Sequence, residues 1–339
     1  MSGRENYWLA LVLGVLSLSF VGTTLYASYS DNRKSRYAYF LAAIWLGIVQ
    51  YLFLTFLGVW GIAVILEKSG IFVSLGLLGE GAMILSGIIA LYGILHAKKI
   101  YITRVDVSIK NLPDYWEGKR IVHISDVHIG HIQRSPFVRK IVKLINREHP
   151  EIVCITGDLF DGMDGKLEHL VDPLLGIESP HGVYYVDGNH ETYLGIERAF
   201  RSLQNTNVRI LRDEIVHIEG INIIGIDYPE TGVKKDIAKT ICTLPGYTSH
   251  APSILLYHVP EQIKKIAQIG IDLELCGHTH AGQMWPFGYI TGLLFEGRDY
   301  GITTIGDYSL LTSSGVGTWG PPMRVGSKSE IVVITLHKK

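Results

Sequence analysis

The chain has 339 residues, which is enough for one large domain or two ordinary ones. Its formal net charge of −1 argues against a basic protein that binds long nucleic acid through a positive surface. The three cysteines are an odd number and form no Cys-x-x-Cys pair, so we expect reduced core residues rather than a disulfide framework.

The apolar residues are concentrated before residue 98 and predict a membrane region. Residues 8–27 and 37–66 carry no charge, and residues 71–95 carry only Glu80. Because a bilayer span needs roughly 20 apolar residues, we predict three transmembrane helices over these ranges, the second tilted or overhanging. A cleaved signal peptide is the alternative for the first run, but that run is longer than the usual apolar core of about 7–15 residues. Glu80 is either a polar contact inside the helix bundle or a side chain near a displaced helix end.

The rest of the chain alternates strand and helix signals. We assign residues 1–98 to the membrane region, 99–118 to a linker and entry to the domain, and 119–339 to a globular domain. Helical patterns occur near 135–145, 192–204 and 260–268. Short β-rich runs occur at 120–125, 152–156, 183–187, 208–211, 215–219, 221–226, 253–257, 273–276, 301–305, 308–313 and 330–336. The expected fold is an α/β mixed-sheet sandwich flanked by helices and preceded by an all-α transmembrane region.

Polar clusters follow five of the predicted strands. They are SDVHIG with Asp126 and His128, TGDLFDG with Asp158 and Asp161, DGNHE with Asn189 and His190, YHVP with His258, and CGHTHAG with His278 and His280. Strand ends that share one edge of an α/β sheet form ligand sites, so the clusters can meet there. The spacings Asp-x-His and His-x-His place two side chains on one side of an extended segment. Carboxylate, imidazole and amide ligands suit Mn²⁺, Zn²⁺ or iron better than Ca²⁺.

In this order the clusters resemble the calcineurin-like metallophosphoesterase superfamily, whose blocks run D-x-H, G-D, G-N-H, H and G-H-x-H. The resemblance covers residues 119–337. The GHTHAGQ motif and the late SSGVG…GPPMRVG stretch are similar to a bacterial membrane-associated branch that includes the YkuE and YaeI groups. Some members of that branch act on the lipid A precursor UDP-diacylglucosamine.

The resemblance implies two divalent metal ions, with Mn²⁺ preferred and Zn²⁺ or iron as alternatives. The first ion would be held by Asp126, His128, Asp158 and His280. The second would share Asp158 and be held with Asn189, His258 and His278. His190 would be catalytic without binding metal, donating a hydrogen bond to phosphate or protonating the leaving oxygen. Glu191 stands where the family often has Asp and receives no catalytic role.

Two neighbouring residues are secondary candidates. Asp161 lies three residues beyond Asp158 and could orient a metal ligand. His131 closely follows the first cluster and could contact substrate. The remaining histidines have no partner pattern and are assigned no role.

The motifs predict a membrane-anchored hydrolase of phosphodiester or pyrophosphate bonds, which two metal ions would catalyse by activating water. The expected partners are the lipid bilayer and a phosphorylated small molecule or lipid, such as a nucleotide-activated glycolipid or a phospholipid. One alternative is a phosphodiesterase that acts on soluble or cyclic nucleotides. A less favoured alternative is a non-catalytic scaffold, which should have lost metal ligands, whereas this chain keeps all of them.

The apolar run at 284–295 directly follows the last metal motif. We interpret it as a lipid-facing flap beside the metals. In the alternative interpretation, Trp285, Phe287 and residues 293–295 pack under a loop.

The distribution of basic residues predicts the orientation of the domain. Two of the segments outside the predicted spans are basic, and their cations are Arg33, Lys34, Arg36, Lys98, Lys99 and Arg104. With three spans, both segments lie on one side of the membrane, which should be the cytoplasmic side. A protease added to inside-out vesicles should therefore digest the domain that follows residue 100. Protection of the domain in those vesicles would contradict this orientation.

Overall fold

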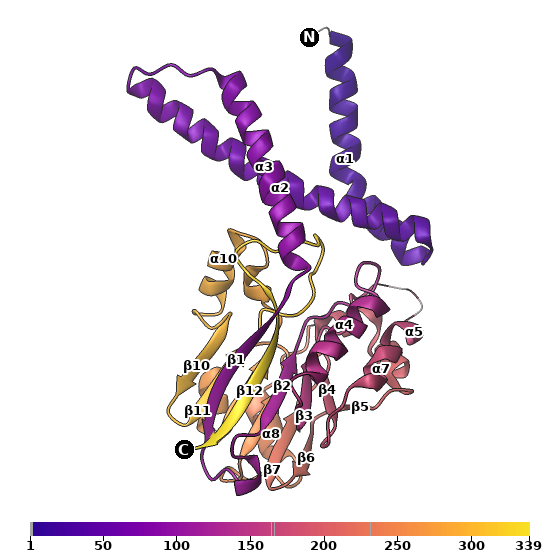
Figure 1. Cartoon of the computed structure of the whole chain (residues 1–339), viewed down its shortest axis with the longest axis vertical. Helices are drawn as coiled ribbons and strands as arrows, with labels where there is room; N and C mark the ends of the chain where they lie inside the picture. The colour runs from indigo at the N-terminus through magenta and orange to yellow at the C-terminus, as the bar shows by residue number, and fades with distance from the viewer. Residues whose placement is uncertain (1–2, 164, 166, 231) are drawn as a thin grey trace. The chain divides into compact units, whose positions relative to one another are not determined.

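The computed structural model describes residues 3–163, 165, 167–230 and 232–339, drawn as a ribbon in Figure 1. The chain separates into two compact units. A helical unit contains the chain up to Lys98 together with the segment Trp319–Val325. A globular unit contains Lys99–Thr318 and Gly326–Lys339.

The helical unit contains three long helices: α1 (Gly3–Tyr29), α2 (Arg33–Lys68) and α3 (Leu75–Ala97). Of the described helices, α2 and α3 are long and apolar enough to cross a bilayer. Only 6% and 22% of their apolar windows are buried, so their apolar side chains face outward, as in a bilayer-spanning helix rather than a core helix. The proposal that α1 is a third span stays a prediction.

The helices start and end at positions that differ from the predicted spans. The Asn32 side chain caps α2 by accepting hydrogen bonds from the backbone N–H groups of Lys34 and Ser35. α2 therefore begins four residues before the predicted 37–66, and α3 begins four residues after the predicted 71. Glu80 is exposed in the second turn of α3. This position favours its interpretation as a side chain near a helix end.

The segment Trp319–Val325 packs on α2 and α3 within the helical unit. Glycines on these helices leave room for it: a Cβ on Gly47 would lie 2.7 Å from Met323 Sδ, and a Cβ on Gly93 would lie 2.9 Å from Val325 Cγ2. The backbone N–H of Arg324 also donates to the carbonyl of Gly93 at 3.0 Å. The PPMRV part of the late sequence motif is thus part of the helical packing.

The globular unit contains all the described strands. They are β1 (Ile100–Ile109), β2 (Arg120–Ile124), β3 (Ile152–Thr156), β4 (Val183–Val186), β5 (Val208–Ile210), β6 (Glu214–Ile218), β7 (Ile221–Gly225), β8 (Ser253–Leu256), β9 (Leu273–Cys276), β10 (Gly301–Ile305), β11 (Tyr308–Thr312) and β12 (Ser329–Lys338). The α-helices are α4 (Ser135–Asn146), α5 (Glu168–Val171), α6 (Asn189–Leu194), α7 (Ile196–Leu203), α8 (Ile237–Thr243), α9 (Ile263–Gln268) and α10 (Phe287–Leu294). Short 3₁₀ turns are η1 (Asp114–Trp116), η2 (Asp172–Gly176) and η3 (His280–Gly282).

The described strands form two six-stranded mixed sheets that pack as a sandwich, which confirms the predicted fold class. Their orders are β1-β12-β2-β3-β4-β5 and β10-β11-β9-β8-β7-β6. Successive side chains of a strand pack into two different hydrophobic cores. In β2, Ile121 packs in the core between the sheets, whereas Val122 packs in the core under α4, α5 and α7. The second sheet is covered on its outer face by α8 and α9. Figure 1 shows α4 and α7 along the sheet of β2–β5. Cys154 and Cys276 are buried in these cores as free thiols, as predicted, whereas Cys242 is exposed.

The structure corrects one predicted boundary. Residues 99–118 are not a linker, because β1 pairs in parallel with β12 over ten residues, from Ile100 to Ile109. Trp116 of η1 is fully buried in the core between the sheets. The domain therefore begins at Lys99. The burial pattern of β1 alternates only toward its end, which makes an edge strand of this kind hard to recognise from sequence.

The topology brings the five polar clusters to one edge. β2, β3 and β4 are parallel neighbours in one sheet, and β8 and β9 are parallel neighbours in the other. The carboxyl ends of the two sets meet, since His258 Nδ1 lies 2.8 Å from the carbonyl oxygen of Thr156. The residues after these strands therefore share one site.

Candidate metal centre

All eight predicted site residues lie together at this edge. Seven of them are at least nine-tenths buried and His278 is partly exposed. The members are Asp126 and His128 after β2, Asp158 after β3, Asn189 and His190 at the start of α6, His258 after β8, and His278 and His280 after β9. The structure thus brings these eight residues together at one edge, and their roles as metal ligands and catalyst stay a prediction.

The first ligand group consists of Asp126, His128 and His280, whose ligand atoms all lie within 4.8 Å of one another. The Nε2 atoms of His128 and His280 are 3.0 Å apart, and His280 Nε2 lies 3.4 Å from Asp126 Oδ1. Ligands about 2.1 Å from a cation are separated from each other by about 3.0–3.4 Å, depending on coordination geometry. These separations fit donors that converge on one metal ion.

The second group consists of Asp158, His258 and His278. His258 Nε2 lies 3.2 Å from both Asp158 Oδ2 and His278 Nδ1. Asn189 Oδ1 joins the group at 2.9 Å from His278 Nδ1 and 3.2 Å from His258 Nε2. The amide oxygen and both imidazoles therefore converge on a second point that fits a cation.

The two groups are linked by a third set of potential ligands. His128 of the first group and Asp158 of the second lie within 4.8 Å of each other and of His190. Asp158 is thus placed between the groups, as expected for a bridging carboxylate. The described residues thus fit two adjacent divalent ions by donor type and by spacing.

Burial and the neighbouring charges strongly shift the pKa values of three residues in the centre. Burial raises the pKa of Asp126 to about 6, and the negative charge of Asp158 adds to this effect. Burial also acts to raise the pKa of Asp158, but the neighbouring His258 outweighs it and holds that pKa well below its usual value. Burial acts to lower the pKa of His258, but Asp158 outweighs it and raises that pKa to about 10. A divalent cation would take over the compensation that protonated imidazoles supply here.

Backbone carbonyls orient two of the imidazoles. The carbonyl of Thr156 lies 2.8 Å from His258 Nδ1, and the carbonyl of Asp161 lies 2.8 Å from His190 Nδ1. A carbonyl only accepts, so each Nδ1 carries the proton and each Nε2 faces the centre. In the neutral form that binds metal, the Nε2 lone pair of His258 is therefore directed at the second ligand group.

Three glycines beside the candidate ligands allow the loops to approach each other. A Cβ on Gly157 would lie 2.5 Å from the His258 ring, and a Cβ on Gly188 would lie 2.3 Å from Asp158 Oδ1. A Cβ on Gly277 would lie 1.9 Å from the Ser125 hydroxyl. Any side chain at these positions would displace a metal ligand or its support.

Backbone strain is concentrated at the same residues. Five of the metal-ligand candidates have φ between +48° and +71°, a region that non-glycine residues rarely adopt: Asp126, His128, Asp158, His278 and His280. Each such residue costs of order 1–3 kcal/mol, which the surrounding structure must offset. These backbone conformations turn the chain sharply at the end of each strand and direct the ligand side chain toward the centre.

Glu191 has a supporting role that the sequence did not reveal. It is fully buried, and its Oε2 accepts hydrogen bonds from the backbone N–H groups of Asp158 at 3.0 Å and Gly188 at 2.7 Å. Its Oε1 accepts from the N–H of Phe160 at 3.0 Å. The carboxylate therefore fixes the backbone on both sides of Asp158 and just before Asn189.

The two secondary candidates and the SSGVG loop differ in how they relate to the centre. The carboxylate of Asp161 lies 3.7 Å from His128 Nδ1, which places it beside the ligand that it was predicted to orient. His131 is buried, a position that does not favour the suggested contact with substrate. The SSGVG loop packs against the first cluster, since a Cβ on Gly315 would lie 2.7 Å from Asp126 Cβ. A Cβ on Gly317 would likewise lie 2.2 Å from the carbonyl oxygen of Val127.

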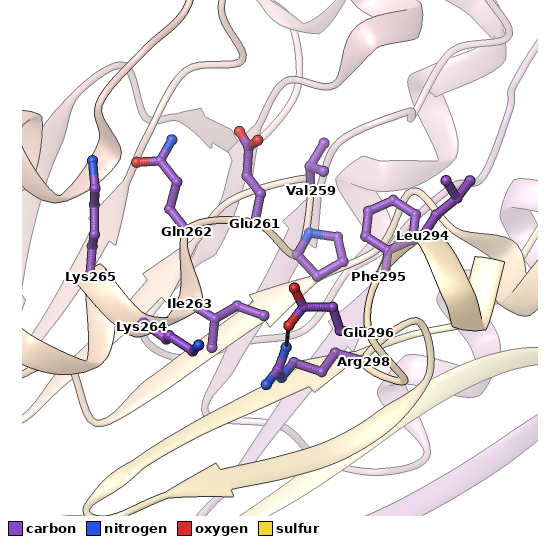
Figure 2. A pocket seen from close by; sticks show the side chains of 11 residues that line it. Val259, Glu261, Gln262, Ile263, Lys264, Lys265, Leu294, Phe295, Glu296 and Arg298 are labelled. Atoms are coloured by element: carbon purple, nitrogen blue, oxygen red, sulfur yellow. Dashed lines mark hydrogen bonds and ion pairs between the residues drawn. The ribbon is translucent and has the colours of Figure 1, made fainter.

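A cleft of about 450 Å³ opens beside the second ligand group. Val259, next to His258, lies on one wall, and Phe295, whose ring packs edge-on 6.1 Å from the His278 ring, lies on another. Figure 2 shows Phe295 and Leu294 on one side of this cleft, with Ile263 and Lys264 on the other. The metal centre thus adjoins a surface that is partly apolar and partly charged.

Comparison with known proteins identifies relatives of this chain. The sequence profile of the family described as calcineurin-like phosphoesterase matches residues 119–282. An uncharacterized metallophosphoesterase of Aquifex aeolicus is 34% identical over 266 residues, covering 76% of this chain and 99% of that protein. An uncharacterized metallophosphoesterase of Helicobacter pylori is 36% identical over 242 residues, covering 71% of this chain and 63% of that protein.

A vertebrate relative also matches. The Danio rerio protein named transmembrane protein with metallophosphoesterase domain is 31% identical over 282 residues, covering 76% of this chain and 62% of that protein. The chain thus spans less than two thirds of the length of the Helicobacter and Danio relatives.

Replacing Glu191 tests the support that it gives to Asp158. In Glu191→Gln one oxygen becomes an NH₂ group that must face a backbone N–H, so at least one buried donor loses its acceptor at a cost of about 1–3 kcal/mol. We expect a lower melting temperature and a metal affinity reduced about 10–100-fold, as measured by metal analysis after equilibration with defined Mn²⁺. The control is Glu191→Asp, which keeps a carboxylate and should retain more metal. Wild-type metal affinity in Glu191→Gln would show that this support is not needed.

Proposed function

The chain belongs to the calcineurin-like phosphoesterase family, and on that premise we propose that it is a membrane-associated, binuclear metal-dependent phosphohydrolase. It cleaves phosphodiester or pyrophosphate bonds, and its substrate is a lipid-linked molecule such as a nucleotide-activated glycolipid or a phospholipid. The observation that carries this proposal is the pair of buried ligand groups joined through Asp158. Mn²⁺ is the preferred metal, with Zn²⁺ or iron as alternatives.

The candidate ligands divide into two sets, one for each metal ion. Asp126, His128 and His280 hold one ion, and Asn189, His258 and His278 hold the other, with Asp158 shared. When bound, a pair of divalent ions activates water and offsets charge on the phosphoryl group. The protein fixes the geometry in advance through the strained strand ends and the carboxylate of Glu191.

His190 is placed to move a proton at the leaving oxygen. Its Nδ1–H is committed to the carbonyl of Asp161, so its Nε2 faces the centre, 3.9 Å from Asp158 Oδ2. As an imidazolium, Nε2–H can donate to the phosphoryl or leaving oxygen and then transfer its proton. The same nitrogen could instead bind metal, since His190 belongs to the set that joins the two groups. We assign it the proton-transfer role.

The membrane location is supported by two observations. α2 and α3 are long, apolar and largely unburied within the helical unit. The Danio rerio and Bos taurus relatives are named transmembrane proteins with a metallophosphoesterase domain. We propose a multi-pass anchor with the metal centre on the cytoplasmic side, as the basic segments predict.

Asp158→Ala tests the binuclear assignment. Both ligand groups lose a shared carboxylate, so metal-dependent hydrolysis should fall to background and bound metal should drop below two ions per chain. The detergent-purified chain would be assayed with added Mn²⁺ on bis-p-nitrophenyl phosphate, a phosphomonoester and UDP-diacylglucosamine. The control is Asp172→Asn, an exposed change in η2. Retained turnover in Asp158→Ala would refute the binuclear centre, and a wild-type chain without metal or activity would favour a scaffold.

His190→Gln separates proton transfer from metal binding. We expect about two ions per chain to remain while kcat falls about 10²–10⁴-fold, the usual contribution of a general acid. The loss should be smallest on substrates whose leaving group is already acidic, such as p-nitrophenol. Metal analysis and steady-state kinetics on the same preparation provide both readouts. Loss of one metal ion would instead identify His190 as a ligand.

A further inference from the structure

The helix α10 is an apolar element with no buried side chain. Its sequence FGYITGLL carries no charge, and neither do the three preceding residues, Met284 to Pro286. Tyr289 is 70% exposed, Leu293 82% and Leu294 72%, and Trp285 and Ile290 are each 50% exposed. The alternative in which this run packs under a loop is therefore not what the structure shows. A contiguous apolar surface of this kind marks an interaction site.

The same helix is fixed to the metal-binding loop. Gly282, two residues after the ligand His280, approaches α10 so closely that a Cβ there would lie 2.1 Å from the backbone nitrogen of Gly288. At its other end, Thr291 Oγ1 donates to Asp299 Oδ2 at 2.7 Å, and Thr279 Oγ1 donates to the carbonyl of Asp299. Whatever α10 binds is therefore held beside the metal ligands.

The residue types indicate a lipid surface rather than a second protein. Trp285 and Tyr289 are aromatic residues of the kind enriched at membrane interfaces, and Leu293 and Leu294 are the kind that enter the acyl region. Lys264 is exposed in the adjoining cleft and can meet an anionic headgroup, whereas Arg298 of the same cleft is paired with Glu296 at 2.7 Å (Figure 2).

The chain itself supplies a bilayer close by. α3 ends at Ala97 and β1 begins at Ile100, so only two residues connect a helix long enough to span a membrane to the globular unit. The globular unit is thus confined near a membrane wherever α3 is inserted. An apolar helix on such a unit meets lipid at a far higher local concentration than any soluble partner.

We propose that α10 is an interfacial helix that inserts its exposed face at the boundary between headgroups and acyl chains, and so brings the phosphoester of a lipid headgroup to the metal centre. The first half of this proposal concerns lipid contact and is independent of catalysis. The second half rests on the proposed hydrolase function and names its substrate class as a bilayer-resident phospholipid or glycolipid.

Site-specific labelling tests the contact with lipid. In a Cys242→Ser background, where Cys154 and Cys276 are buried, Leu293→Cys would carry an environment-sensitive fluorophore in the full chain. Nanodiscs of phosphatidylcholine and phosphatidylglycerol would each hold one chain, with or without lipids that bear a nitroxide on the acyl chain. The matched control is His250→Cys, an exposed position before β8, at the sheet edge opposite the metal centre.

We expect the label at residue 293 to be quenched by nitroxide lipid at least about twofold more than the label at residue 250, and to be shielded from aqueous iodide. Equal responses of the two labels would overturn the proposal. Shielding that appears only when several chains share a disc would also overturn it, because α10 would then be a contact between copies.

The effect on turnover is measured separately. Leu293→Glu should lower the rate on a vesicle-embedded lipid substrate at least about tenfold more than the rate on bis-p-nitrophenyl phosphate, because a carboxylate opposes insertion. The control is Leu175→Glu, the same change at an exposed leucine of η2, which is 55% exposed. An equal loss on both substrates would overturn the role of α10 in substrate access. If the wild-type chain hydrolyses neither substrate, the proposed function fails while the labelling result still decides whether α10 contacts lipid.

Discussion

The buried carboxylate of Asp158 is the constraint on which the site depends. It lies within 3.2 Å of the imidazole of His258, although the two residues come from different sheets. A charge in this position is tolerated only with positive partners, here imidazoles and, in the working protein, metal ions. Its backbone N–H is held by Glu191, and its Oδ1 accepts the N–H of His190 at 2.9 Å. Moving Asp158 would therefore disturb both ligand groups and α6 together.

The sandwich architecture follows from the need to bring these strand ends together. Parallel neighbours in each sheet align their carboxyl ends, and the apolar core between the sheets sets the distance across the site. Gly157, Gly188 and Gly277 then permit a separation that no side chain would allow. The ligand residues at this edge have backbone conformations that non-glycine residues disfavour. The hydrophobic cores on either side supply the stability that offsets this strain.

Much of the site could be predicted from sequence because each ligand directly follows a short apolar run, and strand ends are where α/β folds build sites. Glu191 could not be assigned its role, because the N–H groups of Asp158, Phe160 and Gly188 converge on it only in three dimensions. The sequence does not identify β1 as part of the sheet, because its partner, β12, lies at the far end of the chain. For the same reason, nothing local indicated that Trp319–Val325 packs with α2 and α3.

The exposure of α10 could not be predicted from the sequence either, because the same apolar residues would also suit a helix buried under a loop. Its cause is visible in the backbone. Gly282 meets Gly288 without side chains between them, so the helix contacts the loop through its glycine face and leaves its large residues outside. An apolar surface facing water is unfavourable by about 25 cal/mol per Å², and a soluble domain would be expected to cover it. Its exposure next to the candidate metal centre is the physical basis of the proposed contact between α10 and lipid.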